Sequence, residues 1–390
     1  MSRSPVRWIL VLSIGAAAGI GMARFAFGPV LPALRDDLGW SLTTGGAVQS
    51  ANLGAYLVGS LLTPRIIRRY GLRWPYWYSY IAVGVTLLLT GAAGRVGSHV
   101  ALRLIAGGTA GVLLISGGII AARLSTGATS GLIIGLFFGG VGAGIAVTGL
   151  LLPVAFGSAE GWRIVWWVMG AATVIAAPFV FRSLREACAS IDALPEPPLL
   201  SSARPGGVVV LIRLEIAYIL FGLGSIGYMT FVVALLRGQD ASPAAVGAFW
   251  AVLGMASLVA GRLWAAPINR SESGRLAGLM YLFMAGASLV VTGSSTLGAL
   301  IFSAAAFGSV FVSVVSATTH LIRIQLPQDR WTATLARFTV GYGVAMTIGS
   351  TAAGAMSDRF GLSTSILISA LVLLIAAVAA GLQPGVTAET

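Results

Sequence analysis

The chain has 390 residues, of which 57% are hydrophobic and only 9% are charged. Soluble globular proteins carry about 25% charged residues, so this chain has too few charges to cover a water-exposed surface. The composition therefore excludes an ordinary soluble protein and predicts an all-α polytopic membrane protein. A transmembrane β-barrel is excluded as well, because the apolar stretches are continuous and do not alternate.

The net charge is +12, and every basic residue is an arginine. Nucleic-acid binding is one explanation for so basic a chain. The arginines are scattered over short loops, however, as expected of the cytoplasmic loops of a membrane protein, so we expect no nucleic-acid partner. The single cysteine, Cys188, excludes an intrachain disulfide, and no His/Cys/Asp cluster has metal-ligand spacing. We therefore expect neither a metal nor a cofactor.

Twelve segments are long and apolar enough to span a bilayer. They are residues 8–34, 43–64, 74–94, 98–122, 129–154, 162–182, 208–236, 243–266, 275–295, 297–322, 332–356 and 363–383. The only long polar stretch follows the sixth segment, and its prolines and small polar residues predict a linker. We therefore expect a six-helix bundle at 1–182, a cytoplasmic linker at 183–207 and a second six-helix bundle at 208–390.

The placement of arginines predicts the orientation of the chain. With the N-terminus inside, seventeen arginines fall at the inner ends of the segments and six at the outer ends, while Arg24 lies in the membrane core. Basic residues concentrate on the cytoplasmic side, so both termini are predicted to be cytoplasmic. Because the chain has no lysine, it has no Walker A motif, and transport driven by ATP within this chain is excluded.

The two predicted bundles repeat each other at an offset of about 200 to 202 residues. The run GGVGAGIAVTG at 139–149 pairs with TVGYGVAMTIG at 339–349, and Leu34-Arg35 pairs with Leu236-Arg237. Two six-helix halves in the same orientation are typical of secondary transporters, which bind their substrate near the midplane between the halves.

Several motifs resemble the major facilitator superfamily (MFS). The loop GSLLTPRIIRRYGLRW at 59–74 matches its loop signature at Arg69 and Gly71, although Arg68 stands where an aspartate is usual. RLIAG at 103–107 resembles its Arg-xxx-Gly motif, which is associated with proton coupling or substrate charge. GMARFAFGPVLPALRDDLGWS at 21–41 and SANLGAYLVGSLL at 50–62 resemble the YbfB/YjiJ-like subgroup. The resemblance implies a transporter with the MFS fold, twelve transmembrane helices in two pseudo-symmetric bundles, and it names no cargo.

Two arginines lie where hydrocarbon is expected. Arg24 follows Trp8 by about 24 Å of helix, well inside a ~30 Å hydrocarbon core, where a charge costs at least ~2.5 kcal/mol. Arg103 lies about 7 Å into its span, and no acidic residue in the membrane core of that bundle neutralises either charge. We therefore predict that both bind an anionic substrate. The alternatives are snorkelling or helix packing for Arg24, and interfacial anchoring for Arg103.

The repeat distinguishes Arg24 from the scaffold. At the offset of 202, Ile226 stands opposite Arg24, so the charge belongs to one bundle only. A residue that the duplicated scaffold does not share is better explained by the site than by the fold.

Six further residues are candidates for substrate binding. Gln49, Asn52 and Tyr56 share one face of the second span, and hydrogen bonding to a neighbouring helix is their alternative role. Spans seven, eight and eleven, which line the central cavity in the superfamily, contribute Tyr228, Trp250 and Tyr342, for which simple packing is the alternative.

Glu215 is the candidate proton-coupling residue, because burial raises the pKa of a carboxyl. It follows Arg213 near the inner end of its span, and an ion pair at the membrane surface is the alternative role.

These features predict a secondary transporter of the bacterial inner membrane that takes up a small organic anion, with proton coupling left open. The alternative is a proton-linked exporter of drugs or metabolites, which requires a titrating carboxylate in the cavity. The sequence contains no catalytic motif that would indicate a membrane enzyme or sensor. If the protein were instead a partner in the assembly of other proteins, its structure would lack a central cavity. We expect a monomer whose partners are a small-molecule substrate and the lipid bilayer.

Overall fold

The computed structural model describes residues 4–125, 130–193 and 211–385, and in these ranges every regular element is helical. The first half contains α1 (Ser4–Ala16), the π-helix η1 (Ala17–Met22), α2 (Phe27–Leu38), α3 (Leu42–Tyr70), α4 (Arg73–Ala92), α5 (Val96–Leu124), α6 (Ser130–Ala155) and α7 (Gly161–Asp192). The second contains α8 (Ile212–Gly238), α9 (Pro243–Asn269), α10 (Arg275–Gly293), α11 (Leu297–Phe311), α12 (Ser313–Gln325), α13 (Gln328–Phe360) and α14 (Leu362–Gly381). The predicted all-α membrane fold is confirmed.

Each predicted span corresponds to one helix or to consecutive helices. The first span, 8–34, is divided among α1, η1 and α2, and the tenth, 297–322, is divided between α11 and α12. Nine helical stretches in the described ranges are long and apolar enough to cross a membrane. Among the helices of 18 or more residues, α3, α4 and α13 fall outside that set. The helices α3 and α13 pack together, and there Ser50 Oγ donates to the Thr347 carbonyl.

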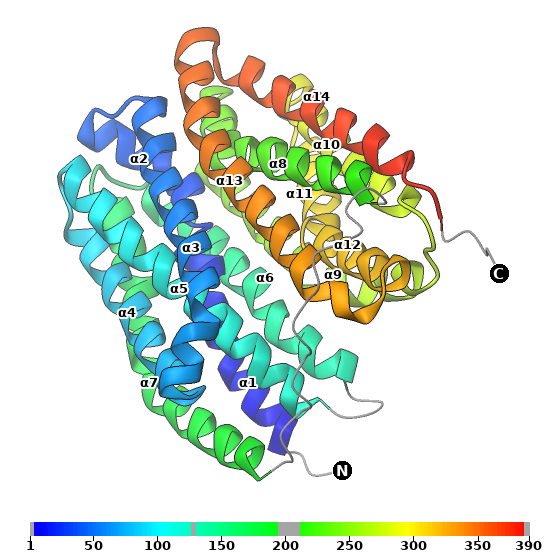
Figure 1. The fold of residues 1–390 in the computed structure, drawn as a ribbon. Helices are drawn as coiled ribbons and strands as arrows, with labels where there is room; N and C mark the ends of the chain where they lie inside the picture. Colours follow the sequence, from blue (N-terminus) through cyan, green and yellow to red (C-terminus); the bar gives the residue numbers. More distant parts are fainter. Residues whose placement is uncertain (1–3, 126–129, 194–210, 386–390) are drawn as a thin grey trace.

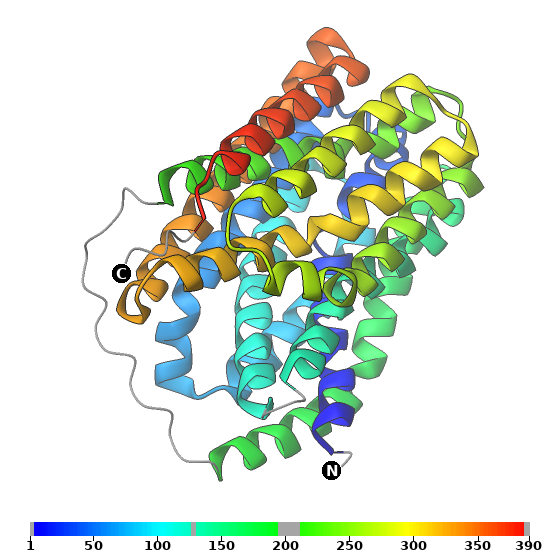
Figure 2. The same ribbon diagram turned by 90° about the vertical axis from the view of Figure 1, so that its right-hand side faces the viewer.

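The helix α7 is longer than its predicted span. It continues to Asp192, so residues 183–192 of the predicted linker 183–207 are helical, and the linker beyond residue 193 lies outside the described residues. The extension is amphipathic, with one buried stripe made of Ser183, Leu184, Ala187, Cys188 and Ile191. It lies beside the start of α1 (Figure 2), where the Trp8 indole donates to Glu186 over 2.8 Å.

Figure 1 shows α1–α7 on the left and α8–α14 on the upper right, joined where α2, α3 and α6 meet α8, α13 and α9. Small residues allow this close approach. A Cβ atom on Gly254 of α9 would overlap the backbone of α6 at Ala146, and one on Gly142 would overlap α9 at Leu258. The helix backbones therefore touch across the junction without intervening side chains.

We call the face where α1 begins the terminal face and the opposite one the far face. At the far face, a carboxylate of the second half binds the start of a helix in the first. Asp358, at the end of α13, accepts hydrogen bonds from the Leu42 and Thr43 amides (2.9 and 2.7 Å) and from the Thr43 hydroxyl (2.6 Å). A carboxylate at a helix N-terminus satisfies free amides and complements the helix dipole. We call this contact the far-face bridge.

The first amides of α3 have a second acceptor inside the first half. Ser41 precedes the helix, and its hydroxyl accepts from the Thr44 amide over 3.0 Å. The far-face bridge therefore adds to a helix that is already capped.

Toward the terminal face the two halves separate. The helices α3 and α13 diverge in that direction (Figure 1). One of their close approaches before the divergence brings Leu57 against Gly343. The far-face bridge therefore joins the halves at the far face, and the α3 and α13 backbones diverge toward the terminal face.

We expect the Asp358→Asn substitution to loosen closure of the far face. The reporter is the Ser350→Cys, Cys188→Ala variant, because the Ser350 hydroxyl is buried against the Gly46 carbonyl between the two halves. Maleimide labelling at position 350 should become faster when Asp358 is replaced. The control is Asp240→Asn, which changes another exposed acid on the same face, and equal labelling of both variants would contradict the assignment.

The far-face bridge should also depend on pH in one direction. Partial burial acts to raise the pKa of the Asp358 carboxyl, but the hydrogen bonds from Thr43 and Leu42 and the nearby Arg35 lower this pKa below its ordinary value. A lowered pKa means that the bridge is complete above about pH 4, the ordinary value, and weakens only as the pH falls through the lowered one. The ratio of labelling rates at position 350 with and without the Asp358→Asn substitution, in which the pH dependence of the thiol itself cancels, should therefore stay constant from neutral pH to about pH 5.

Candidate functional site

The first membrane span is interrupted near its middle. After α1 the chain widens into η1, in which the Ala23 amide bonds to the Ala18 carbonyl, and residues 23–26 separate η1 from α2. The glycines of this region let α6 approach closely, since a Cβ on Gly21 would overlap Gly144. Interrupted helices free backbone carbonyls and are frequent at transporter sites. Arg24 lies within this interruption.

Side chains of the first half bind the freed carbonyls. The Arg103 guanidinium donates to the Ala23 carbonyl, and the Gln49 amide donates to the Arg24 carbonyl over 3.1 Å. The Asn52 amide in turn donates to the Arg103 carbonyl over 3.1 Å. Two predicted binding residues, Arg103 and Gln49, thus hold the backbone of the interruption, while Asn52 holds the backbone of α5. Hydrogen bonding to a neighbouring helix is the role that the alternative anticipates for Gln49 and Asn52.

The Arg24 side chain extends across the junction to the second half. Its Nη2 donates to the Met346 thioether over 3.0 Å, and its Nε has no hydrogen-bond partner among the residues that the structure describes. The guanidinium lies 4.6 Å from the centre of the Tyr56 ring and 5.2 Å from that of Phe25. The side chain is only 6% exposed, and a thioether is a weak acceptor. Within the described residues, the charge of Arg24 is therefore buried without an anionic partner.

A small cavity adjoins this guanidinium. Its volume is about 20 Å³, enough for a water-sized guest, and both halves contribute to its wall. The lining residues are Arg24, Leu53, Tyr56, Leu57, Thr339, Tyr342, Gly343 and Met346. Leu57 and Gly343 also form the close contact beside the divergence of α3 and α13. The cavity thus lies at the point where the halves begin to part, and we call it the Arg24 cavity.

The structure places Arg103 away from the Arg24 cavity. Its guanidinium lies between the rings of Phe27 (5.2 Å) and Trp166 (4.7 Å), inside the first half. The side chain is 1% exposed and its Nη1 binds the interruption. The two arginines therefore differ in partners, since Arg103 binds backbone of its own half and Arg24 reaches the other half.

Of the predicted binding residues in the second half, one lines the Arg24 cavity and the others are buried elsewhere. Tyr342 lines the Arg24 cavity, and its side chain interacts with the Arg24 guanidinium. Tyr228 is buried, with its hydroxyl 2.7 Å from Ser303 and its ring stacked on Phe307 at 4.0 Å. Trp250 is fully buried in α9, and its indole nitrogen has no partner among the described residues. Of the three, only Tyr342 belongs to the Arg24 cavity.

Glu215 forms an ion pair with a different arginine from Arg213, the partner that its sequence neighbourhood suggests. Glu215 lies 2.7 Å from Arg337 of α13, whereas Arg213 donates to the Leu382 carbonyl. Residues 213 and 215 are two apart on a helix and cannot face each other, which is why the neighbouring arginine is not the partner. Glu215 is the only buried acidic side chain in the part of the chain that the structure describes.

Two residues that contact the Arg24 guanidinium are apolar and were therefore not among the residues predicted from the sequence. Phe25 contacts the guanidinium from the adjacent position, and Met346 accepts its hydrogen bond. The Arg-Phe pair was visible in the motif at 21–41, but nothing in the sequence distinguishes Met346 from a packing residue. Long-range partners of this kind require the fold.

The fold and the site together define a membrane transporter of the major facilitator class, in which two halves alternate access to a site between them. The chain belongs to the family described as the uncharacterised MFS-type transporter YbfB, whose model matches residues 16–381. The predicted subgroup is confirmed. No curated protein sequence matches the chain.

Solved structures of transporters share the fold. A D-xylose-proton symporter is 16% identical, with a TM-score of 0.76, and the match covers 99% of this chain and 100% of that one. A bacterial homologue of the human lysosomal transporter Spinster, in an inward-facing and unoccupied conformation, is 15% identical with a TM-score of 0.72 and coverage of 98% and 97%. The nucleoside transporter NupG is 12% identical with a TM-score of 0.70 and coverage of 97% and 98%. These likenesses show the fold alone.

We expect the two arginines to differ in their effect on stability. Arg103→Met removes a charged donor from the Ala23 carbonyl and should destabilise the protein by about 1–3 kcal/mol. Arg24→Met removes a buried charge that has no anionic partner among the described residues, so it should be neutral or stabilising. Thermal unfolding of the purified variants measures the difference, and equal losses of stability would contradict the distinct roles.

Proposed function

We propose that the chain takes up a small organic anion across the bacterial inner membrane and that Arg24 binds the anionic group. The supporting observation is the buried Arg24 guanidinium, whose Nε is unpaired among the described residues and whose Nη2 donates to the Met346 thioether, a weak acceptor. A carboxylate offers two oxygens in the geometry that matches a guanidinium. Binding one there would neutralise a charge that the low dielectric of the site makes costly.

The position of Arg24 fits alternating access. The residue belongs to the interrupted first span, and its side chain contacts α13 of the other half. When the halves rotate, the distance from Arg24 to Met346 and Tyr342 must change. An anion held between them would therefore be bound differently in the two states, which is the requirement for coupling a ligand to a conformational change.

The proposal includes the orientation of the protein in the membrane. The excess of arginines at the terminal face, where α1 begins, favours a cytoplasmic location for that face and for both termini. The α3 and α13 backbones would then diverge toward the cytoplasm.

Glu215 is the proposed proton-coupling residue. Its carboxylate is paired with Arg337 at 2.7 Å, and Arg337 lies on α13 two residues before Thr339 of the Arg24 cavity. Protonation of Glu215 would release Arg337 and alter the end of α13 that moves against α3. The alternative of a proton-linked exporter requires a carboxylate within the cavity, and the described lining residues include none.

Transport of an anion should require the guanidinium of Arg24. In vesicles that contain the protein, Arg24→Ala should reduce uptake of labelled carboxylates at least about tenfold, since hydrogen bonds to a charged group contribute roughly 1.5–3 kcal/mol. Arg24→Lys keeps the charge without the two-pronged geometry and should retain intermediate uptake.

Arg182→Ala is the matched control, because Arg182 is an exposed arginine at the terminal face. Uptake by Arg24→Ala at the rate of the parent would show that the anion site is elsewhere.

A proton-coupled cycle should depend on Glu215. The Glu215→Gln variant cannot titrate, so its uptake should lose the stimulation that an inward proton gradient gives the parent, while exchange of substrate at equal pH continues. The same gradient response in parent and variant would exclude this role. Glu186→Gln, which changes a half-buried carboxylate that does not line the Arg24 cavity, controls for a general effect of removing a carboxylate.

A further inference from the structure

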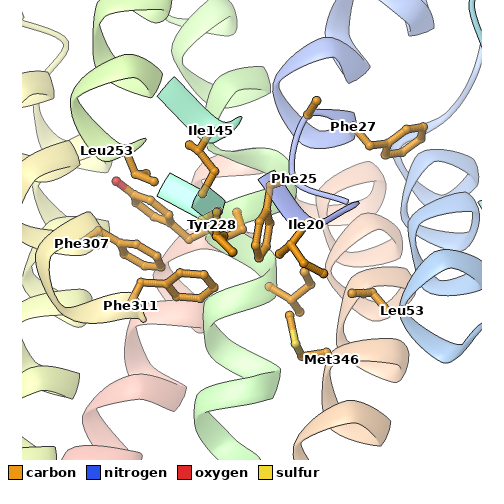
Figure 3. Packing of buried hydrophobic residues seen from close by; sticks show 14 of the residues in the cluster. Ile20, Phe25, Phe27, Leu53, Ile145, Tyr228, Leu253, Phe307, Phe311 and Met346 are labelled. Atoms are coloured by element: carbon orange, nitrogen blue, oxygen red, sulfur yellow. The ribbon is translucent and has the colours of Figure 1, made fainter. Parts of the chain in front are cut away.

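Aromatic rings continue outward from the Arg24 guanidinium in both halves. Phe25 contacts Phe311 of the second half edge to face, with ring centres 5.5 Å apart. Phe311 contacts Phe221 at 5.9 Å, and Phe221 stacks on Tyr342 at 5.2 Å. Tyr342 lines the Arg24 cavity, so the series of rings returns to the guanidinium. Figure 3 shows Phe25 between Ile20 and Phe311, with Met346 below.

These rings lie where the two halves must separate. Phe25 belongs to the first half, whereas Phe221, Phe311 and Tyr342 belong to the second. Because Phe25 and Phe311 belong to different halves, movement of the halves against each other would separate these two rings. Exposing large aromatic faces to water is unfavourable, in proportion to the apolar area exposed. A ligand that carries a flat apolar ring would cover these faces when the halves part.

The charges near the site limit the number of anionic groups on the ligand. Arg24 is the only cationic side chain that lines the described cavity. Arg103 is bound to the Ala23 carbonyl inside the first half and is unavailable. A second carboxylate on the ligand would be buried without a partner, which is costly. The site therefore fits one negative charge.

The cavity wall has too few polar side chains to bind a sugar-like ligand. Apart from Arg24, the cavity wall offers three polar side chains: Tyr56, Thr339 and Tyr342. A polyhydroxylated ligand needs a hydrogen-bond partner for each buried hydroxyl, because burying an unpaired hydroxyl weakens binding. Rings around a single guanidinium instead match an apolar ring with one acidic group.

We propose that the ligand of the Arg24 cavity is an aromatic monocarboxylate. The carboxylate binds the Arg24 guanidinium, and the ring packs against Phe25, Phe311 and Tyr342. The cavity of about 20 Å³ is too small for a ring, so the ring occupies the space that opens as Phe25 and Phe311 separate. This proposal rests on the proposed function and adds the chemical class of the substrate.

The test measures thermal unfolding of the purified protein in the presence of carboxylates that differ in the group attached to the carboxylate. Benzoate at millimolar concentration should raise the thermal transition, because a ligand stabilises the state that it binds. Acetate, succinate and cyclohexanecarboxylate at the same concentration should raise it much less, and so should benzamide, which has the ring but no charge. No stabilisation by benzoate, or equal stabilisation by acetate or cyclohexanecarboxylate, would overturn the aromatic assignment.

Variants separate the ring from the charge. Phe25→Leu should weaken benzoate binding about threefold to tenfold, the range expected for one aromatic contact, and leave the weak effect of acetate unchanged. Phe138→Leu is the matched control, since Phe138 is an exposed phenylalanine of α6. The transition without ligand confirms that both variants fold. Equal benzoate binding by Phe25→Leu and Phe138→Leu would remove Phe25 from the site.

The Arg24→Ala variant distinguishes the two proposals. If several carboxylates bind equally and all require Arg24, the aromatic class is wrong and the anion site remains. If benzoate binds Arg24→Ala as tightly as the parent, the anion site itself is wrong, and the proposed function fails with it.

Discussion

The organisation of the junction depends on one unneutralised charge. Arg24 lies inside the membrane span, 6% exposed, with a thioether and aromatic rings as its described neighbours. Such a charge is unfavourable in the folded protein unless a partner arrives. The first half nonetheless holds it rigidly, because Gln49 and Arg103 bind the two carbonyls that the interruption frees. The backbone at Arg24 is therefore held by its own half, while the Arg24 side chain extends toward the second half.

The two buried arginines show how position along a helix decides the role of a residue. Both lie in the same half, both contact aromatic rings, and neither has an acidic partner among the described residues. Arg103 lies within α5 and faces the interruption of the first span, where the Ala23 carbonyl accepts its hydrogen bond. Arg24 sits in the interruption itself, so its side chain points away from that backbone toward the second half. The same chemical group therefore supports the scaffold in one place and remains available in the other.

Hydrophobicity along the chain was sufficient to predict the spans, because a bilayer imposes a minimum length on every crossing helix. The interruptions were not predictable in this way. Neither residues 23–26 nor Val312, which separates α11 from α12, contains a proline, and glycine-rich helices without interruption occur elsewhere in the chain. The end of α7 was missed for another reason. Its last turns are amphipathic, so counting apolar residues ended the helix at 182.

Candidate site residues that lie close together in sequence could be named from local patterns, whereas their long-range partners could not. Tyr56 was found because it shares a helix face with Gln49 and Asn52, and Tyr342 because of the span that contains it. The partners Met346 and Arg337 lie more than a hundred residues from Arg24 and Glu215, and no local pattern connects them. Packing of the two halves brings Arg24 to Met346, and packing of α8 against α13 within the second half brings Glu215 to Arg337.

The far-face bridge has a consequence for the speed of opening. Asp358 shares the start of α3 with Ser41, which belongs to the same half as the helix. When Asp358 withdraws, Ser41 remains in place, and the Leu42 and Thr43 amides are released beside the aqueous phase, where water can bind them at once. The helix end keeps its shape through the change, so no refolding step has to precede movement of the halves. The bond that fastens the far face is thus one that solvent can exchange.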